Sequence, residues 1–219
     1  MMTMMRTALA GLLLSVGLSG MAHADNPRER VADAVASITE RVQQERQRLE
    51  QDPAYARQVV REELEGLVDF KRITRLVMSR HFATASREQK YRFLEVFQDS
   101  LVNTYASGIT LYQGQTISVL PLGEGDVRGD RARVRSEITA DDGRVIPVFF
   151  SLYQDDQGAW LVENVIVNGL NLGKTFRAQF DQAVEQYGGD LDQVIANWSS
   201  ELEIEGEKAA ANPASADEA

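Results

Sequence analysis

Apolar residues in the first part of the chain recur every three or four positions, which is the spacing of one face of an α-helix. A first helix is indicated by the apolar series Val31, Val35, Ile38, Val42 and Leu49. Asp52-Pro53 then predicts a second helix, because Asp is a good N-cap and Pro is favoured at the first helical position. The apolar positions of this second helix are Val59, Val60, Leu64 and Leu67.

Two more helices are predicted before the pattern changes. Asp69 is expected to cap a helix whose buried side carries Ile73, Leu76 and Val77. Ser86 followed by Gln89 is a capping box, which opens a long helix that Gly114 is expected to end. One face of that long helix carries Phe93, Phe97, Leu101 and Tyr105. Such an aromatic stripe is more typical of plain core than of a ligand site.

From Thr116 onward the apolar positions alternate with polar ones, which is typical of β-strands. Ile117 and Val119 define a short first strand, and the second strand alternates small or apolar residues with Arg131, Arg133 and Arg135. Asp142-Gly143 predicts a hairpin turn. Residues 145–153 are apolar on both faces, which favours a central strand covered on both sides, and residues 159–167 form a fourth strand.

The last part of the chain returns to helical spacing. One helix carries Phe176, Phe180 and Tyr187 and stops at Gly188-Gly189, and a final helix ends near Trp198. Helices in residues 25–115, followed by a sheet and C-terminal helices in 116–204, predict an α+β fold with an antiparallel sheet of about four strands. Four strands need few helices as cover, so the extra helices are expected to pack elsewhere or to enclose a cavity. Residues 205–219 are expected to be a disordered acidic tail.

Composition removes several classes of protein. The chain has 219 residues, of which 43% are hydrophobic and 26% are charged, as in a folded domain. It has no cysteine, which excludes disulfides, zinc–thiolate sites, iron–sulfur clusters and cysteine nucleophiles. A net charge of −10 argues against nucleic acid as a partner.

The N-terminus resembles an export signal. Arg6 is followed by an apolar run over residues 8–18, and Ala22-His23-Ala24 provides small residues around a cleavage position. Residues 1–24 are therefore predicted to be a signal peptide, which places a soluble mature protein in the periplasm. No cysteine follows the apolar run, so attachment of a lipid anchor is not expected.

Little in the sequence points to catalysis. There is no nucleophile elbow, phosphate-binding loop, dinucleotide fingerprint or zinc motif, so we expect no catalytic residues, no metal and no enzyme activity. His81 has no obvious carboxylate partner nearby in the sequence, which favours a packing role over that of a base. Asp141-Asp142 and Asp155-Asp156 lie in predicted turns without calcium-loop spacing. The arginines of the second strand favour a solvated face over a docking site for an acidic partner.

Several motifs, in this order, resemble the MlaC family of periplasmic phospholipid-binding proteins, the toluene-tolerance auxiliary component. The resemblance runs from about Val31 to Trp198. Two features depart from the family pattern: the usual Gly-Val-Ser-Leu segment is Gly169-Leu170-Asn171-Leu172, and the usual aspartate of the last strand is Asn164. The motifs that carry the resemblance are Asp69-Phe70 with Val77, Ala85-Ser86-x-x-Gln89 with Phe93 and Phe97, Thr104-Tyr105, Tyr112-x-Gly114, Trp160 with Val165, and Gly169-Leu170-x-Leu172.

The resemblance implies a fold, a cargo and partners. The fold would be a twisted sheet of the NTF2-like, cystatin-roll type with a helical subdomain around an apolar pocket. The protein would carry phospholipid, with no other cofactor, between an outer-membrane lipoprotein–porin complex and an inner-membrane ABC transporter complex with an MCE domain. Such a shuttle would maintain outer-membrane lipid asymmetry, and free diffusion would suit a monomer.

We expect the acyl chains to contact apolar residues at the junction of helices and sheet, although each of these residues could equally be ordinary core. Leu170 is the first residue to test, because the neighbouring Gly169 indicates a chain bend near an opening. Two other functions stay open, a periplasmic chaperone or adaptor and an NTF2-like enzyme acting on a small apolar substrate. The predicted pocket residues are Leu76, Val77, Leu101, Tyr105, Val148, Phe150, Val165, Val167, Leu170, Leu172 and Phe176.

Overall fold

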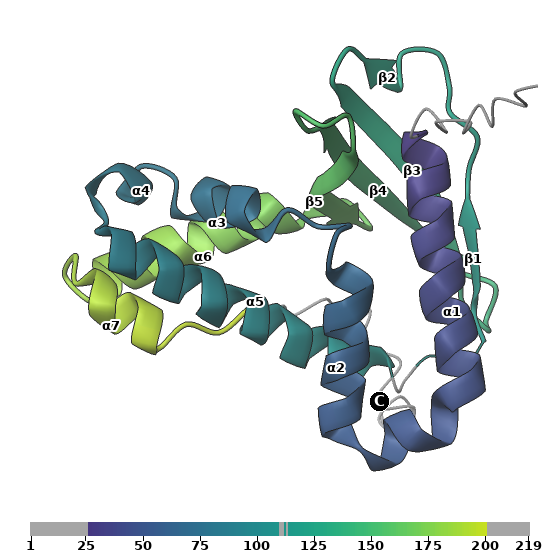
Figure 1. The fold of residues 1–219 in the computed structure, drawn as a ribbon, viewed down its shortest axis with the longest axis horizontal. Coiled ribbons are helices and arrows are strands. Elements are labelled where there is room, and N and C mark those ends of the chain that lie inside the picture. The colour runs from purple at the N-terminus through teal and green to yellow at the C-terminus, as the bar shows by residue number, and fades with distance from the viewer. Residues whose placement is uncertain (1–25, 110–111, 113, 201–219) are drawn as a thin grey trace, which may run out of the picture.

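The computed structural model describes residues 26–109, 112 and 114–200 (Figure 1). Along the chain, helices precede and follow the strands of one sheet. Residues 1–24 and 205–219, predicted to be the signal peptide and the tail, lie outside the described residues. In chain order the helices are α1 (Pro27–Gln51), α2 (Pro53–Leu64), α3 (Phe70–Met78), α4 (His81–Thr84), α5 (Arg87–Ile109), α6 (Leu172–Gln186) and α7 (Leu191–Ala196).

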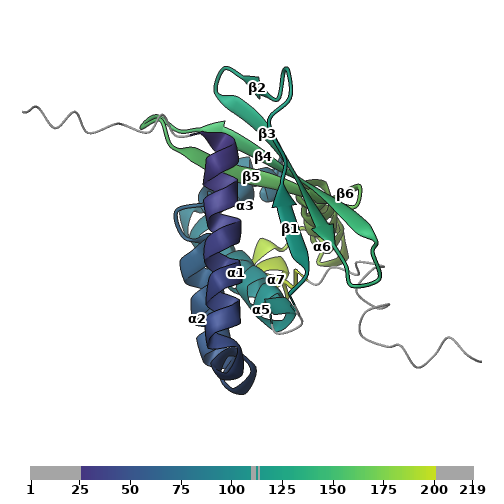
Figure 2. The ribbon, with the colours of Figure 1, turned by 90° about the vertical axis from the view of Figure 1, so that its right-hand side faces the viewer.

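The strands form one antiparallel sheet in the order β1-β3-β4-β5-β6, with β2 paired to β3 (Figure 2). The four longest strands are those predicted from the sequence. The two-residue strands β2 and β6 were not expected, because so short a segment shows no periodicity. The strand bounds are β1 (Thr116–Val119), β2 (Val127–Arg128), β3 (Arg131–Thr139), β4 (Val145–Gln154), β5 (Trp160–Val167) and β6 (Leu170–Asn171).

Side chains at the starts of the helices fix where most of them begin. The Asp52 carboxylate accepts hydrogen bonds from the amides of Ala54 and Tyr55, and Asp69 accepts one from the Arg72 amide. The predicted capping box also forms, since the Ser86 amide donates to Gln89 and the Gln89 amide donates to the Ser86 hydroxyl. These helix starts were therefore predictable from local sequence.

Three details differ from the predicted helices. The second helix ends at Leu64, which leaves Leu67 in the connection to α3. The long helix ends at Ile109, before Gly114. The short helix α4 was not predicted, because four residues carry no measurable period.

Figure 1 shows how the helices divide between two places. The long α1 lies along the sheet, with contacts to β1 and β3, and α2 turns back beside α1. Helices α3, α5, α6 and α7 pack together to the left of the sheet in Figure 1 and form a helical subdomain. The extra helices thus form a second packing unit, as the strand count had led us to expect.

The core has three parts, and one of them is shared by α1, α2 and α5. In the helical subdomain the rings of Phe93 and Phe180 meet edge to face at 4.7 Å between centroids, and Trp198 meets Phe93 at 5.1 Å. Under α1 the inner face of the sheet buries Val134, Leu152 and other apolar side chains. The first part of the aromatic stripe predicted on the long helix is core, since Phe93 and Phe97 are fully buried, whereas Tyr105 is 42% exposed.

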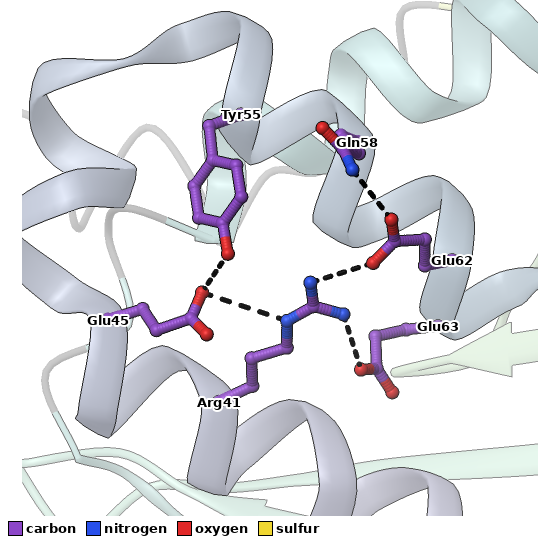
Figure 3. Close-up of polar contacts among 6 residues, drawn as sticks. All are labelled: Arg41, Glu45, Tyr55, Gln58, Glu62 and Glu63. Carbon is purple, nitrogen blue, oxygen red and sulfur yellow. Dashed lines mark hydrogen bonds and ion pairs between the residues drawn. The ribbon is translucent and has the colours of Figure 1, made fainter.

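Arg41 joins α1 to α2 by a group of polar contacts (Figure 3). Its guanidinium contacts the carboxylates of Glu62 at 2.7 Å and Glu63 at 3.3 Å, both on α2, and that of Glu45 on α1 at 3.7 Å. The Tyr55 hydroxyl donates to Glu45 at 2.5 Å. One arginine therefore connects acidic groups from both helices of this hairpin.

Candidate functional site

A cavity of about 230 Å³ lies where α2, α3, α5 and α6 meet strands β4 and β5. Among its lining residues, only Tyr105, Glu163 and Asn164 have polar side chains. We call it the central cavity. Its lining residues are Leu64, Leu67, Val68, Phe70, Ile73, Phe97, Leu101, Tyr105, Phe150, Val162, Glu163, Asn164, Val165, Leu172, Gly173 and Phe176.

Regular spacing places the lining residues on common faces. On α5, Phe97, Leu101 and Tyr105 are four residues apart, so they follow one side of the helix. On the sheet, Phe150 pairs directly with Val165 across β4 and β5. One face of α5 and one part of the sheet therefore supply two apolar sides of the cavity.

Six of the eleven predicted pocket residues lie in the cavity wall, and five do not. Leu76 is 50% exposed, and Val77 is buried in the helical core. Val148 and Val167 pair with each other two positions beyond Phe150 and Val165, and Leu170 lies next to them in β6. The six in the wall are Leu101, Tyr105, Phe150, Val165, Leu172 and Phe176.

The wall also contains residues that the sequence reasoning did not select. Ile73 and Phe97 belonged to predicted apolar stripes and could have been chosen on that ground. Leu67 was an apolar position of the predicted second helix, but Val68 belonged to no predicted stripe. Both residues lie in the segment between α2 and α3, residues 65–69, which we call the connector. Its position depends on pairing with a strand far along the chain.

The connector is held against β5 by backbone hydrogen bonds. The Val162 amide donates to the Leu67 carbonyl at 2.8 Å, and the Asp69 amide donates to the Val162 carbonyl at 3.2 Å. Val68 and Val162 form an isolated parallel bridge. The register of β4 and β5 shifts at Ser151/Leu152, close to this bridge. The connector thus pairs with the sheet beside the cavity.

Polar side chains reinforce this attachment. The Tyr153 hydroxyl donates to the Asp69 carboxylate, and Arg72 contacts Glu163 at 2.5 Å while lying 4.0 Å from the Tyr153 ring centroid. Arg131 also pairs with Glu163. Burial, together with the hydrogen bond to Asp69, raises the pKa of Tyr153 to about 12, so the hydroxyl keeps its proton at neutral pH.

Asn164, one of the two departures from the family pattern noted in the sequence, holds the start of α6. Its side-chain oxygen accepts from the Gly173 amide at 2.9 Å, and its amide group donates to Asn171 at 3.2 Å. Asn171 in turn accepts from the Lys174 amide as the N-cap. A neutral side chain therefore performs this positioning without a carboxylate.

His81 has the carboxylate partner that the sequence did not reveal. Its Nε2 lies 2.9 Å from Asp181 on α6, and its ring lies 5.9 Å from the Phe180 ring. The neighbouring sequence could not reveal this partner, because Asp181 lies a hundred residues further along the chain. His81 does not line the central cavity.

Each of the three arginines of β3 contacts an acidic or aromatic side chain of this protein. Arg131 pairs with Glu163, Arg135 lies 3.8 Å from Asp126, and the Arg133 guanidinium lies 4.2 Å from the Phe149 ring centroid. Across the described ranges, no group of three or more His, Asp or Glu residues is arranged to hold a metal ion. In the same part of the chain, no helix has the length and apolarity needed to cross a membrane.

Together, the fold and the cavity define an α+β protein with an open antiparallel sheet and an apolar interior site. The sequence model described as MlaC protein matches residues 32–200. The chain belongs to this MlaC family, and the resemblance seen in its motifs is confirmed.

Known proteins support the family and the fold. The toluene tolerance protein ttg2D of Pseudomonas putida is 32% identical over 203 residues, covering 92% of this chain and 93% of its own. The intermembrane phospholipid transport system binding protein MlaC of Haemophilus influenzae is 22% identical over 185 residues, covering 83% of this chain and 77% of its own. The solved structure of a phospholipid-binding protein from Ralstonia solanacearum, in complex with a phospholipid, matches this structure with a TM-score of 0.71. The two sequences are 22% identical, and the match covers 78% of this chain and 93% of that protein. This last similarity confirms the expected fold class.

Proposed function

We propose that this protein binds the acyl chains of a phospholipid in its central cavity and carries the lipid between two membranes, without catalysis. The observation that carries the proposal is the nearly continuous apolar wall between α5 and the sheet. The names of the relatives from Haemophilus influenzae and Ralstonia solanacearum, which refer to phospholipid transport and phospholipid binding, support it.

The energetics of lipid transfer explain why an apolar cavity suits this task. Two chains of about 16 carbons contain about 30 methylene groups, so exposing them to water costs on the order of 25 kcal/mol. A carrier has to offset most of that cost with apolar contacts, but it must not bind so tightly that release stops. A cavity with few polar contacts meets both conditions, since exchange with a bilayer then lies near balance.

The size of the central cavity implies that loading enlarges it. A cavity of about 150 Å³ holds a molecule of the size of benzene, so 230 Å³ is small for even one long acyl chain. We propose that the helical subdomain moves away from the sheet to admit the lipid. The headgroup then remains mostly in solvent, and headgroups of different chemistry are tolerated.

The cellular setting is part of the proposal. We place the mature protein in the periplasm as a monomer that exchanges lipid with an outer-membrane lipoprotein–porin complex and an inner-membrane ABC transporter complex. The family and the names of the relatives support this setting.

Lipid extraction tests the proposed function. Purified protein is extracted with organic solvent and the extract is quantified by mass spectrometry, with stoichiometric phospholipid expected from the natural sequence. Val165→Glu places a charge in the cavity wall, and burying a charge without a partner is strongly unfavourable. We expect this variant to lose nearly all of its phospholipid. Val145→Glu is the matched control, because Val145 is 52% exposed on β4, and it should retain the lipid.

A second variant covers the case in which Val165→Glu fails to fold. Val165→Phe fills part of the cavity without adding charge and should also lower the lipid content, while circular dichroism remains unchanged. Undiminished phospholipid in well-folded Val165→Phe and Val165→Glu would place the lipid elsewhere. A natural protein that yields no phospholipid would instead favour a chaperone or adaptor.

A further inference from the structure

A second cavity, of about 210 Å³, lies between α3, α4 and the first half of α5. It shares no lining residue with the central cavity, so it is a separate feature of the helical subdomain. We call it the α3–α5 cavity. Its lining residues are Lys71, Thr74, Phe82, Arg87, Lys90, Tyr91 and Leu94.

Three of these lining residues are cations, and no carboxylate is among them. In the part of the chain that the structure describes, Lys71, Arg87 and Lys90 form no ion pair with an acidic group. Their sequence neighbours behave differently, since Arg72 pairs with Glu163 and Arg92 pairs with Asp192. In a chain with a net charge of −10, three unpaired cations around one cavity create a local excess of positive charge.

Aromatic rings position two of these cations. The Lys90 ammonium lies 4.6 Å from the Phe82 ring centroid, and the Arg87 guanidinium lies 5.5 Å from the Tyr91 ring centroid. A cation over a ring is attracted by the ring's negative face but keeps its full charge and its hydrogen-bond donors. The rings therefore restrict where Lys90 and Arg87 lie and leave both able to bind an anion.

Thr74 provides an independent observation. It is 2% exposed, and within the described residues its hydroxyl has no hydrogen-bond partner. A buried hydroxyl without a partner is unfavourable, because it has lost its hydrogen bonds to water. Thr74 lines the α3–α5 cavity, so rotation of its side chain toward an acceptor oxygen bound there would supply the missing partner.

We propose that the α3–α5 cavity binds a phosphoryl group, with Lys71, Arg87 and Lys90 as the cationic donors and Thr74 as a neutral donor. A phosphoryl group fits better than a carboxylate, because its several oxygens can accept from four donors in different directions. The phosphoryl group belongs either to free phosphate or to the headgroup of an anionic lipid. The inference does not depend on the proposed function, since no residue of the central cavity takes part.

The first experiment is a titration of the full-length protein with inorganic phosphate, followed by amide chemical shifts in NMR at constant low ionic strength. We expect saturable shifts in residues 71–74 and 87–91. Thr74→Val keeps the side-chain shape but removes the hydroxyl, and a hydrogen bond to a charged ligand is worth enough to weaken binding about tenfold. Thr74→Ser keeps the hydroxyl and should bind nearly as well as the natural protein.

The charge is tested by Lys90→Gln, which should weaken binding about fivefold and reduce its dependence on salt. Lys174→Gln is the matched control, because Lys174 is exposed at the start of α6 and lies outside the α3–α5 cavity. Absence of saturable shifts at these amides would overturn the proposal. Equal binding by the natural protein, Thr74→Val and Lys90→Gln would also overturn it.

A second titration distinguishes the two sources of the phosphoryl group. A short-chain phosphatidylglycerol, dihexanoyl phosphatidylglycerol, is added below its micelle concentration in place of phosphate. Tighter binding of this lipid at residues 71–74 and 87–91, lost in Lys90→Gln, assigns the α3–α5 cavity to an anionic lipid headgroup. Binding of inorganic phosphate alone at these amides assigns it to the free ion.

Discussion

Gly173 and Asn164 show how two residues determine the start of α6, the helix that closes one side of the central cavity. A Cβ atom at position 173 would lie 2.7 Å from the Asn164 side-chain oxygen, which is closer than such atoms approach in proteins. The same oxygen accepts the hydrogen bond from the Gly173 amide. Glycine is needed here because of a close contact and not because of an unusual φ angle.

We therefore predict that Gly173→Ala lowers the free energy of unfolding by about 1–2 kcal/mol, because the added methyl group displaces the Asn164 side chain. Urea denaturation measures the effect. In an Asn164→Ala background the added methyl group meets no side-chain oxygen, so the same substitution should cost less than about 0.5 kcal/mol. An equal cost in both backgrounds would mean that the contact is not responsible.

The α1–α2 hairpin illustrates how charged groups join two elements that also share a buried apolar cluster. The Gln58 amide and the Arg41 guanidinium donate hydrogen bonds to the Glu62 carboxylate, and both lower its pKa (Figure 3). The folded protein therefore holds a proton on Glu62 less readily than the unfolded chain does. The lowered pKa stabilises the folded state at pH values above the pKa of the unfolded chain, which is about 4.3. This stabilisation is lost as the pH falls through the lower pKa of Glu62 in the folded protein.

Glu62→Gln should accordingly be less stable than the natural protein at pH 7, and the difference should shrink as pH falls below about 4. The measurement is the free energy of unfolding at a series of pH values. Glu95→Gln is the control, because Glu95 is an exposed carboxylate on α5, and its effect should vary little with pH. A Glu62→Gln effect that stayed constant with pH would contradict the assigned role of the carboxylate.

Most elements could be predicted because their signals are local. Asp52-Pro53, Asp69 and Ser86 with Gln89 mark helix starts within a few residues, and alternating or continuously apolar runs mark the four longest strands. The connector could not be predicted in this way, since Leu67 and Asp69 pair with Val162 through backbone hydrogen bonds that no local pattern encodes. The His81–Asp181 contact was missed for the same reason.

Across the whole molecule, the central cavity lies between the sheet and the helical subdomain, so its opening depends on what joins them. The connector links the two, and the hydrogen bond from the Tyr153 hydroxyl to the Asp69 carboxylate helps to hold it on β5.

The cavity-lining residues could be predicted only in part for a related reason. Spacing identified which faces are apolar, but only the packing of one layer on the other determined that Leu101 and Phe150 border a cavity while Val77 and Val148 do not.

Removing the Tyr153 hydroxyl should weaken the attachment of the connector to β5. In Tyr153→Phe we expect hydrogen exchange at the Asp69 and Val162 amides to accelerate about fivefold to tenfold, because a net hydrogen bond of about 1 kcal/mol is lost. Exchange measured by NMR at neutral pH provides the test. Tyr187→Phe, at the end of α6, should leave these two amides unchanged. Equal exchange in the natural protein and in Tyr153→Phe would show that the backbone pairing alone holds the connector.

The wall of the central cavity is assembled from segments that extend from Leu64 to Phe176. During synthesis or export, a chain that has emerged only as far as β5 lacks the side that α6 provides, and its apolar surfaces face water. The binding compartment can therefore arise only late in folding, once the C-terminal helices have docked. A chain truncated before α6 would expose those surfaces permanently and would become a target for proteases and aggregation.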